Sequence, residues 1–444
     1  MKLILEELRF ESTPYRTPLK FGDAVVDRGT LLVVKLSLLD GDRFATGVGA
    51  MVLGNAWSFP QVPFNLSMAV MRELGQQIAN HLPAQAPSSS VFELSHELEA
   101  RTLDLARELS QTFAGLSVPI PKLCSLVVFS AFDIALFDAW GKLNHSNTFE
   151  LLQQTPEAHD LSRWLDQDFR QFGLQQTLSA APVASLPMFH LVGGLDPLSP
   201  TEVRNPVNDG LPEHLQAWIS KDELTHLKIK LRGDDPAWDY QRIVSVDRVA
   251  SDSVAGEPVY SLDFNEKCES AEVLVDLLQR LNTDASVAFR RIAYIEQPTS
   301  RDLLDRPQDR MHAAAKLKPV VIDEALTDYA AFKRAREMGY SGVALKACKG
   351  IAHSLLMAAA CRKNNLFLCV QDLTCPGLAL LASASLAAWL GVEAIEANAR
   401  QFCPSANDAM RLRRPEVFNV RRGCIHTGGF TTPGLGFEVD TPKQ

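Results

Sequence analysis

Charged residues recur in this chain at the ends of short apolar segments, at a regular spacing. Each segment is continuous and rich in Leu or β-branched residues, which is typical of parallel strands covered on both faces. Stretches with apolar residues at three- and four-residue spacing, typical of amphipathic helices, separate the segments. The charged residues are Lys228, Lys230, Asp263, Glu296, Asp323, Lys346 and Asp372.

The apolar segments are numerous enough to close a barrel. Six of them end at these charged residues, and the segments 186–191 and 394–399 bring the number to eight. From Asp263 to Asp372 the successive intervals are 33, 27, 23 and 26 residues, the length of one strand and one helix. The pattern predicts an α/β fold, a (β/α)8 barrel of the TIM type. Because the carboxyl ends of all strands meet at one mouth, we expect the charged side chains to share a site.

The chain of 444 residues is longer than one barrel requires, and the surplus lies at the amino-terminal end. Residues 1–59 alternate in the style of antiparallel strands. We predict an α+β domain over residues 1–125 and the barrel over residues 126–414. The helices expected in the first region and at its border with the barrel cover about 65–82, 91–113 and 123–143.

Composition excludes some partners. The formal net charge of −9 disfavours nucleic acid or an anionic membrane as the main partner. No apolar run approaches the roughly 20 residues of a membrane helix, and the first residues are too acidic for a signal peptide. The eight cysteines form no C-x-x-C pair, so we expect them to be reduced. These features predict a cytoplasmic protein.

Three of the charged residues have the chemistry of metal ligands. Asp263, Glu296 and Asp323 come from three separate strands and have no His among them. Such an all-oxygen set favours Mg²⁺ or Mn²⁺ over zinc. An ion held in this way keeps open positions, so it can bind a substrate carboxylate and stabilise the enolate that forms when the α-carbon loses its proton.

The lysines supply candidate bases. Lys228 and Lys230 are two residues apart on one strand, so both point into the barrel mouth. Neighbouring positive charge favours the neutral amine that a base requires. Lys346 comes from the sixth strand, across the barrel. Two lysines on opposite sides of one carbon can remove a proton from one face and return it to the other, or one can be the base and the other an electrostatic partner.

Each residue also has a structural explanation. A lone Asp at a strand end is most often a helix N-cap, and Lys-x-Lys on a strand is usually a solvated face. The order of base, three acids and base, each at a strand end, favours the functional reading. A barrel that binds metal and a ligand without turnover is the alternative from another class.

The chain resembles the enolase superfamily, and within it the muconate lactonizing enzyme subgroup (mandelate racemase/muconate lactonizing enzyme-like), over nearly its whole length. Residues 130–142, SAFDIALFDAWGK, are similar to the helix that precedes the barrel in that family. The other similar motifs are Lys228-Ile229-Lys230 for K-x-K, Asp263-Phe264-Asn265 for D-x-N, Glu296-Gln297-Pro298 for E-Q-P and Asp323-Glu324 for D-E.

The resemblance implies a role for each of these residues. The first 125 residues would form a capping domain, completed by residues 415–444, and an assembly of identical subunits would be common. The implied metal ligands are Asp263, Glu296 and Asp323, with Asn265 and Glu324 behind them. The implied acid–base pair is Lys230 and Lys346, with Lys228 supporting Lys230.

The chain departs from the family pattern in several places. Lys346-Ala347-Cys348-Lys349 is not followed by the usual Gly-Gly pair, which leaves Lys349 as a second candidate for the sixth-strand base. The stretches 154–184 and 194–220 resemble additions beside the first strand. Candidate substrate contacts are Trp57, Asp372 and Glu396, for which a domain plug, a helix cap and a strand-end group are the structural alternatives.

The resemblance also narrows the reaction. Relatives that act on acid sugars or mandelate carry a His on the seventh strand, and residues 366–377 contain none. Two-lysine chemistry remains, acting on a small carboxylate. We therefore predict an isomerase, a cycloisomerase of muconate type or a racemase or epimerase of N-acyl amino acids or dipeptides. The alternative is a lyase, a dehydratase of the o-succinylbenzoate synthase type.

Overall fold

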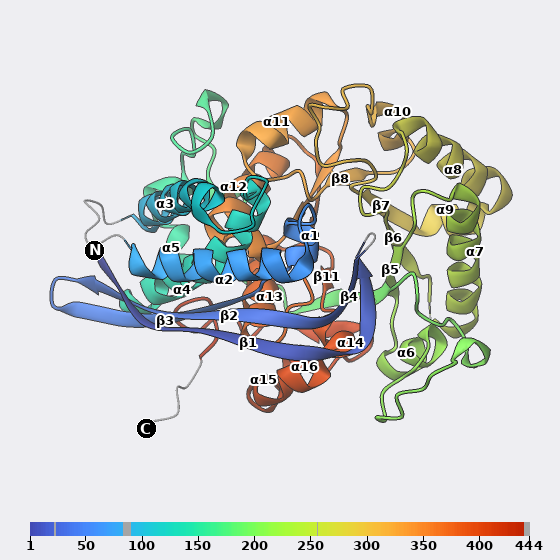
Figure 1. Ribbon diagram of the computed structural model, residues 1–444, viewed down its shortest axis with the longest axis horizontal. Helices are drawn as coiled ribbons and strands as arrows, with labels where there is room; N and C mark the ends of the chain where they lie inside the picture. The colour runs from blue at the N-terminus through green and yellow to red at the C-terminus, as the bar shows by residue number, and fades with distance from the viewer. Residues whose placement is uncertain (22–23, 83–89, 255, 439–444) are drawn as a thin grey trace.

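The computed structural model of this chain contains a closed barrel of eight parallel strands (Figure 1). Closure occurs because β11 (Ile395–Glu396) pairs both with β10 (Phe367–Val370) and with β4 (Ser185–Val192). All eight predicted strands are present, so the predicted barrel is confirmed. The others are β5 (His226–Lys230), β6 (Val259–Asp263), β7 (Ile292–Glu296), β8 (Val320–Ile322) and β9 (Gly342–Leu345). The structure describes residues 1–21, 24–82, 90–254 and 256–438.

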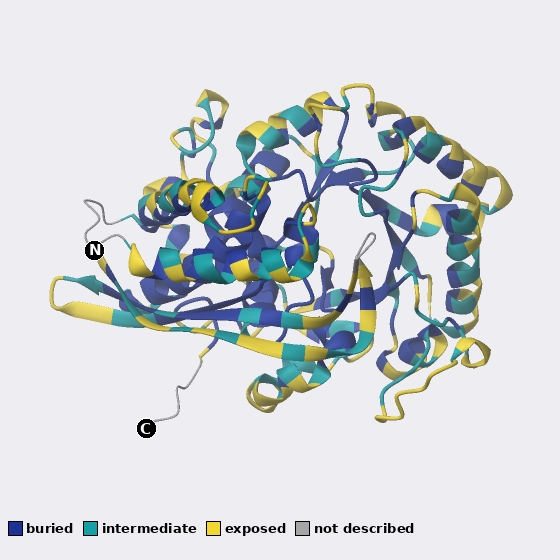
Figure 2. Ribbon diagram, viewed as in Figure 1, coloured by how far each residue is buried: buried dark blue, intermediate teal, exposed yellow. Residues whose placement is uncertain are grey.

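Helices follow the strands and cover the outside of the barrel, with their inner faces buried (Figure 2). Several begin at a side-chain cap whose oxygen accepts a backbone N–H: Asp235 accepts from Trp238, Ser270 from Val273 and Asp328 from Ala331. Such caps satisfy donors that the first turn leaves open. The long barrel helices are α7 (Pro236–Ser253), α8 (Ala271–Asp284), α11 (Tyr329–Glu337), α12 (Ile351–Lys363) and α13 (Leu378–Leu390).

The amino-terminal region is an antiparallel sheet covered by helices. Its strands lie in the order β1 (Lys2–Phe21), β2 (Ala24–Asp40) and β3 (Arg43–Val52). Gly47 and Gly49 of β3 allow close approach of a helix, since a Cβ there would lie 2.1 and 2.0 Å from helix carbonyl oxygens. The covering helices are α2 (Phe64–Asn80), α3 (Val91–Thr112) and α4 (Lys122–Leu143), near the predicted ranges.

The helix α4 joins the sheet to the barrel. By length and composition it is apolar enough to cross a membrane, so the expectation that no apolar run approaches that length is wrong for this helix. Its apolar window is completely buried within the protein, as in the core helix of a globular fold. The predicted domain boundary after residue 125 falls inside this helix. The division into two domains remains a prediction.

Two buried aspartates of α4 hold distant segments together. Asp138 accepts hydrogen bonds from the backbone N–H of Val48 in β3 and of Leu435 near the carboxyl terminus, at 3.0 and 3.1 Å. Asp133 accepts from the backbone N–H of Ile351 and Ala352, the first turn of α12. The helix therefore fixes the start of the barrel helix that follows the Lys346 strand.

The carboxyl-terminal segment packs against the first barrel strand and against the helix α4. Its return to residues 1–125, which the resemblance implies, stays a prediction. Its strand β12 (Cys424–His426) pairs antiparallel with β4, and Asn147 forms a bridge with Gly434. A Cβ on Gly141 of α4 would lie 2.8 Å from the Cα of Gly434, so this contact also requires glycine. The last six residues of the predicted segment 415–444 lie outside the described residues.

We expect Asp138→Ala to lower the free energy of unfolding by about 2–5 kcal/mol, because two buried N–H groups lose their acceptor. Urea unfolding followed by circular dichroism measures this change. The control is Asp104→Ala on the surface of α3, where an exposed pair with Arg107 is lost and about 0–1 kcal/mol is expected. Equal losses in the two variants would contradict the role of Asp138.

The pH dependence of stability tests the second aspartate. Burial raises the pKa of Asp133 from near 3.8 to about 7, although Ser95 and two backbone N–H groups donate to it. A carboxyl whose pKa is higher in the folded state stabilises the fold below its unfolded pKa, and this contribution is lost as the pH rises through 7. Asp133→Asn is therefore expected to gain stability relative to the wild type between pH 4 and 7.5. A constant difference over that range, in urea titrations, would contradict it.

Candidate active site

The side chains at the barrel mouth follow directly from the strand period. Six residues form a layer inside the barrel: Phe189, Tyr294, Val321, Ala344, Cys369 and Ala394. Side chains alternate along a strand, so the residue two positions further on faces the same interior. Those residues, at the carboxyl ends of the strands, are Leu191, Glu296, Asp323, Lys346, Gln371 and Glu396.

The strands β5, β6 and β7 align three charged residues in one row. Lys230 pairs in register with Asp263, and Asp263 with Glu296. All three residues are at most 7% exposed. The predicted lysine and two of the predicted carboxylates are therefore adjacent in the sheet, and Asp323 follows the end of β8, the next strand.

Lys228 lies among three carboxylates. Its Nζ is 3.0 Å from Asp263, 2.7 Å from Glu296 and 2.9 Å from Glu396, all of them buried. Although burial opposes its charge, these carboxylates raise the pKa of Lys228 well above its ordinary value. Lys228 is therefore held as an ammonium group. It links the carboxylates of β6 and β7 to Glu396 in β11.

Lys230 lies two residues after Lys228 on the same strand and is nearer the mouth. Its ammonium group contacts the carboxylate of Asp263 and donates to Oδ1 of Asn265 at 3.0 Å. Asn265 has a φ of 45°, the left-handed region, so the turn after β6 directs this amide back toward the lysine. Asn265 therefore contacts the charged cluster through Lys230.

The structure separates the two candidate lysines after β9. Lys346 lines the central pocket, with its Nζ 2.7 Å from Asp323 and 3.8 Å from Glu296. Lys349 is fully buried and does not line that pocket; its Nζ donates to the backbone oxygen of Asp323 at 2.6 Å. Lys346 therefore faces the space where a substrate would lie, and Lys349 holds Asp323 from behind.

Opposite charges balance within this buried cluster. Burial alone would raise the pKa of Asp263 and of Asp323, but the neighbouring lysines hold both below their ordinary values. Burial and the charge of Asp263 raise the pKa of Glu296 to about 8. Glu296 is thus the carboxyl group whose charged form the lysines compensate least.

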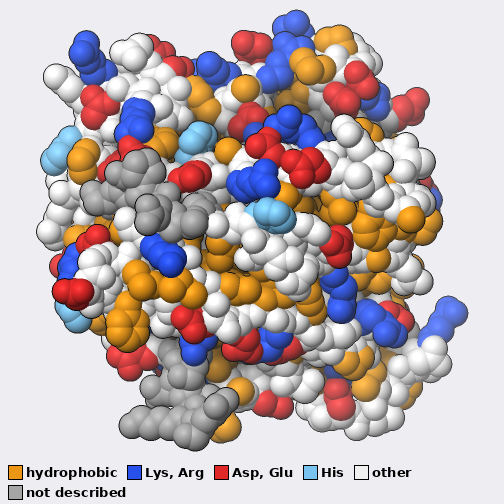
Figure 3. Space-filling model, turned by 60° about the vertical axis from the view of Figure 1, so that its left-hand side comes forward, with side chains coloured by type: hydrophobic (Ala, Val, Ile, Leu, Met, Phe, Trp, Pro, Cys, Tyr) orange, Lys and Arg blue, Asp and Glu red, His pale blue; other side chains and the backbone are white. Residues whose placement is uncertain are grey.

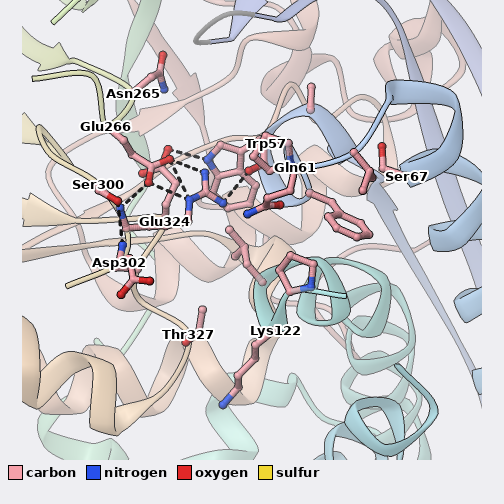
Figure 4. A pocket seen from close by; sticks show the side chains of 18 of the residues that line it. Trp57, Gln61, Ser67, Lys122, Asn265, Glu266, Ser300, Asp302, Glu324 and Thr327 are labelled. Atoms are coloured by element: carbon pink, nitrogen blue, oxygen red, sulfur yellow. Dashed lines mark hydrogen bonds and ion pairs between the residues drawn. The ribbon is translucent and has the colours of Figure 1, made fainter. Parts of the chain in front are cut away.

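The residues proposed as substrate contacts differ in their surroundings. Trp57, in α1 (Asn55–Ser58), donates from Nε1 to Glu324 at 2.9 Å, as Figure 4 shows. Asp372 accepts the backbone N–H of Cys375 and of Asn398, both at 2.6 Å. The next helix begins at Leu378 with Gly377 as its N-cap, so the alternative that Asp372 is a helix cap is wrong. Glu396 pairs with Lys228. Trp57, Asp372 and Glu396 all line the central pocket.

Sequence reasoning missed Gln371. Its side-chain amide donates to Glu296 at 2.5 Å, whereas the neighbouring Asp372, which was selected, turns to the backbone. Strand alternation carried the signal, because Cys369 packs inside the barrel and Gln371 is two residues later. The charge of Asp372 favoured that residue in the sequence-based prediction, although the strand phase directs Gln371 into the barrel.

Two spaces of very different volume lie at the charged cluster. The central pocket has a volume of about 20 Å³, enough for about one water molecule. A cavity of about 990 Å³ lies beside it, between the segment 56–67 and the loops after β6, β7 and β8. Trp57 and Asn265 line both spaces, so they form the wall between them.

Comparison with known proteins identifies the family. Residues 210–443, more than half of the chain, match the model of the enolase C-terminal domain-like family. The chain belongs to the enolase superfamily. Within that superfamily it is of the mandelate racemase and muconate lactonizing enzyme kind. A comparison with curated protein sequences gave no match.

Solved structures of the superfamily share the fold at low sequence identity. Muconate lactonizing enzyme from Pseudomonas fluorescens, complexed with muconolactone, has a TM-score of 0.62 and 17% identity, covering 99% of this chain and 98% of its own. Dipeptide epimerase from Enterococcus faecalis, with Mg and L-Leu-L-Tyr, has a TM-score of 0.64 and 15% identity, covering 98% and 99%. L-Ala-D/L-Glu epimerase from Bacillus subtilis has a TM-score of 0.60 and 18% identity, and the match covers 98% of each chain.

The carboxylates of this superfamily member fit a divalent cation by their chemistry. Within the described residues, no three His, Cys, Asp or Glu side chains form a ready metal cage. The ammonium groups of Lys228 and Lys346 lie instead among Asp263, Glu296 and Asp323. The three carboxylates therefore hold positively charged groups at this point of the barrel. A donor set made only of oxygen atoms is also the one that Mg²⁺ and Mn²⁺ prefer.

We expect Mg²⁺ to stabilise the protein against thermal unfolding, by about 2.7 kcal/mol at a concentration of 100 times Kd. Glu296→Gln removes one charged ligand and is expected to weaken the binding of Mn²⁺, measured by electron paramagnetic resonance, by roughly tenfold or more. Asp372→Asn is the control, because that side chain accepts hydrogen bonds from backbone N–H groups. Equal affinity in wild type and Glu296→Gln would contradict the assignment of the ligands.

Proposed function

We propose that this protein is a divalent-metal-dependent isomerase that removes and returns the proton on the carbon next to a substrate carboxylate. The observation that carries the proposal is the placement of Lys230 and Lys346 on one central pocket, from strands β5 and β9. Three strands separate these two in an eight-stranded barrel, so the amines approach the pocket from opposite sides.

The proposed ligands are Asp263, Glu296 and Asp323. When bound, a divalent cation supplies the positive charge that lowers the cost of placing negative charge on the substrate carboxylate. The side chains of Leu19, Leu191 and Leu373 line the same pocket and give it apolar surface. In such surroundings electrostatic stabilisation is larger than in water.

The two lysines divide the proton transfer. An amine on one side takes the proton from the α-carbon, and the ammonium on the opposite side returns one to the other face, which inverts the centre. Lys228 stays paired with Glu396 and holds positive charge beside Lys230. Asn265 fixes the direction of the Lys230 amine through its 3.0 Å hydrogen bond.

The substrate class is proposed from the same chemistry. A small molecule with a carboxylate and an acidified α-carbon fits, such as a dipeptide, an N-acyl amino acid or a muconolactone. Acidic and basic side chains are interspersed over the face in Figure 3, which suits a small-molecule enzyme better than a polyanion-binding protein. All eight cysteines are free, in agreement with a cytoplasmic location.

Proton exchange in D₂O tests the proposal. The protein is incubated with Mg²⁺ and pools of dipeptides, N-acyl amino acids, muconolactones and the o-succinylbenzoate precursor, and deuterium at the α-carbon is followed by mass spectrometry. We expect exchange that EDTA abolishes and that Lys230→Ala and Lys346→Ala each lower by roughly 10²-fold or more for one enantiomer.

A matched lysine variant provides the control. Lys318 donates to the backbone oxygens of Arg290 and Ile292 at the opposite end of the barrel, so Lys318→Ala should leave exchange unchanged. Loss of water from the substrate, seen as a mass decrease of 18, would identify a dehydratase instead. No metal-dependent exchange with any pool would reject the proposed reaction.

A further inference from the structure

The central pocket requires a change of shape before a substrate enters. Its volume of about 20 Å³ is far below the few hundred Å³ of an ordinary ligand site. The neighbouring 990 Å³ cavity is large enough, and the wall that separates the two spaces includes the indole of Trp57. The position of Trp57 therefore determines how the two spaces connect.

Trp57 is held from three directions. Its Nε1 donates to Glu324 at 2.9 Å, and its ring lies over Nζ of Lys346, 4.7 Å from the ring centroid. The third contact involves its backbone: Nη1 of Arg301 donates to the carbonyl oxygen of Trp57 at 3.0 Å. A cation over an indole face is attracted to it, so the position of Trp57 also bears on the proposed acid–base lysine.

Arg301 is itself fixed to Glu266, in the loop after the neighbouring strand β6. Its backbone N–H donates to Glu266 Oε1 at 2.6 Å, and its guanidinium group forms further bonds with both carboxylate oxygens of Glu266. Bidentate pairs of this kind are geometrically specific. The ion pair thus joins the loops after β6 and β7 and presents a guanidinium N–H to α1.

The Arg301–Glu266 ion pair also bears on the position of Lys230. Glu266 follows Asn265, and both have positive φ values, 67° and 45°. Non-glycine residues adopt this conformation only where surrounding contacts hold it. Since Asn265 bonds to Lys230, the Arg301–Glu266 pair supports the turn that orients one lysine and the helix that covers the other.

We propose that Arg301 is a positioning residue, which holds Trp57 of α1 over Lys346 and keeps the central pocket separate from the 990 Å³ cavity. The inference rests on the proposed function only for its effect on catalysis. Its structural part concerns the backbone and side chain of Trp57, and it can be measured without a substrate.

Hydrogen–deuterium exchange of the backbone tests the structural part. In Arg301→Met we expect the amides of residues 54–59 to exchange about tenfold faster or more, since one hydrogen bond to a charged group is lost. Arg301→Lys keeps a donor and should restore part of the protection. Residues 31–52, in the strands β2 and β3, should be unchanged and report on general loosening.

The control is Arg306→Met in the same loop, where Arg306 pairs with Asp309 at 2.7 Å and has no contact with α1 in the described structure. This variant should leave residues 54–59 as protected as in the wild type. The proposal is overturned if Arg301→Met leaves 54–59 unchanged, if Arg306→Met has the same effect, or if 31–52 loosens equally.

The catalytic consequence is measured separately with the substrate found by α-proton exchange. Arg301→Met is expected to lower kcat by about tenfold or more while the Kd for Mg²⁺ stays within about twofold. Absence of exchange in the wild type would reject the proposed reaction and leave the hydrogen–deuterium result to decide the role of Arg301. An unchanged kcat in Arg301→Met would overturn its effect on Lys346.

Discussion

Buried carboxylates and lysines at the barrel mouth compensate one another, and the arrangement of this region depends on that balance. Isolated charges at these positions would be too costly to bury. Lys228 contacts three carboxylates, and Asp323 is held by Lys346 on one side and Lys349 on the other. Removal of any one partner would leave another buried charge without compensation.

The amino-terminal region contributes to this cluster as well as covering it. Trp57 brings an indole ring to Lys346, and α4 supplies the aspartates that fix α12 and the returning carboxyl terminus. These contacts bring together residues more than 200 positions apart in the chain. The charged cluster is therefore in contact with both regions, through the packing of α1 and α4 against the barrel.

Much of the fold was predictable because the signals are local. A continuous apolar segment followed by a helix predicts one βα unit, and eight such units close a barrel. The phase of the strands also places Glu296, Asp323 and Lys346 at the mouth. The same argument, applied to β10, selects Gln371 instead of Asp372. Charge guided the sequence-based choice at that point, and strand phase determined the side chain that faces the cluster.

The sequence by itself determined the number and order of the strands and the acids and lysines that end them, because both follow from periodicities of two and about 3.6 residues. Only the tertiary structure decided that Lys346 faces the pocket while Lys349 lies behind Asp323, and that Arg301 holds Trp57. The contact between Arg301 and Trp57 joins residues 244 positions apart, and that of Lys349 with Asp323 joins neighbouring βα units. Both depend on how the side chains pack in three dimensions, which no local pattern encodes.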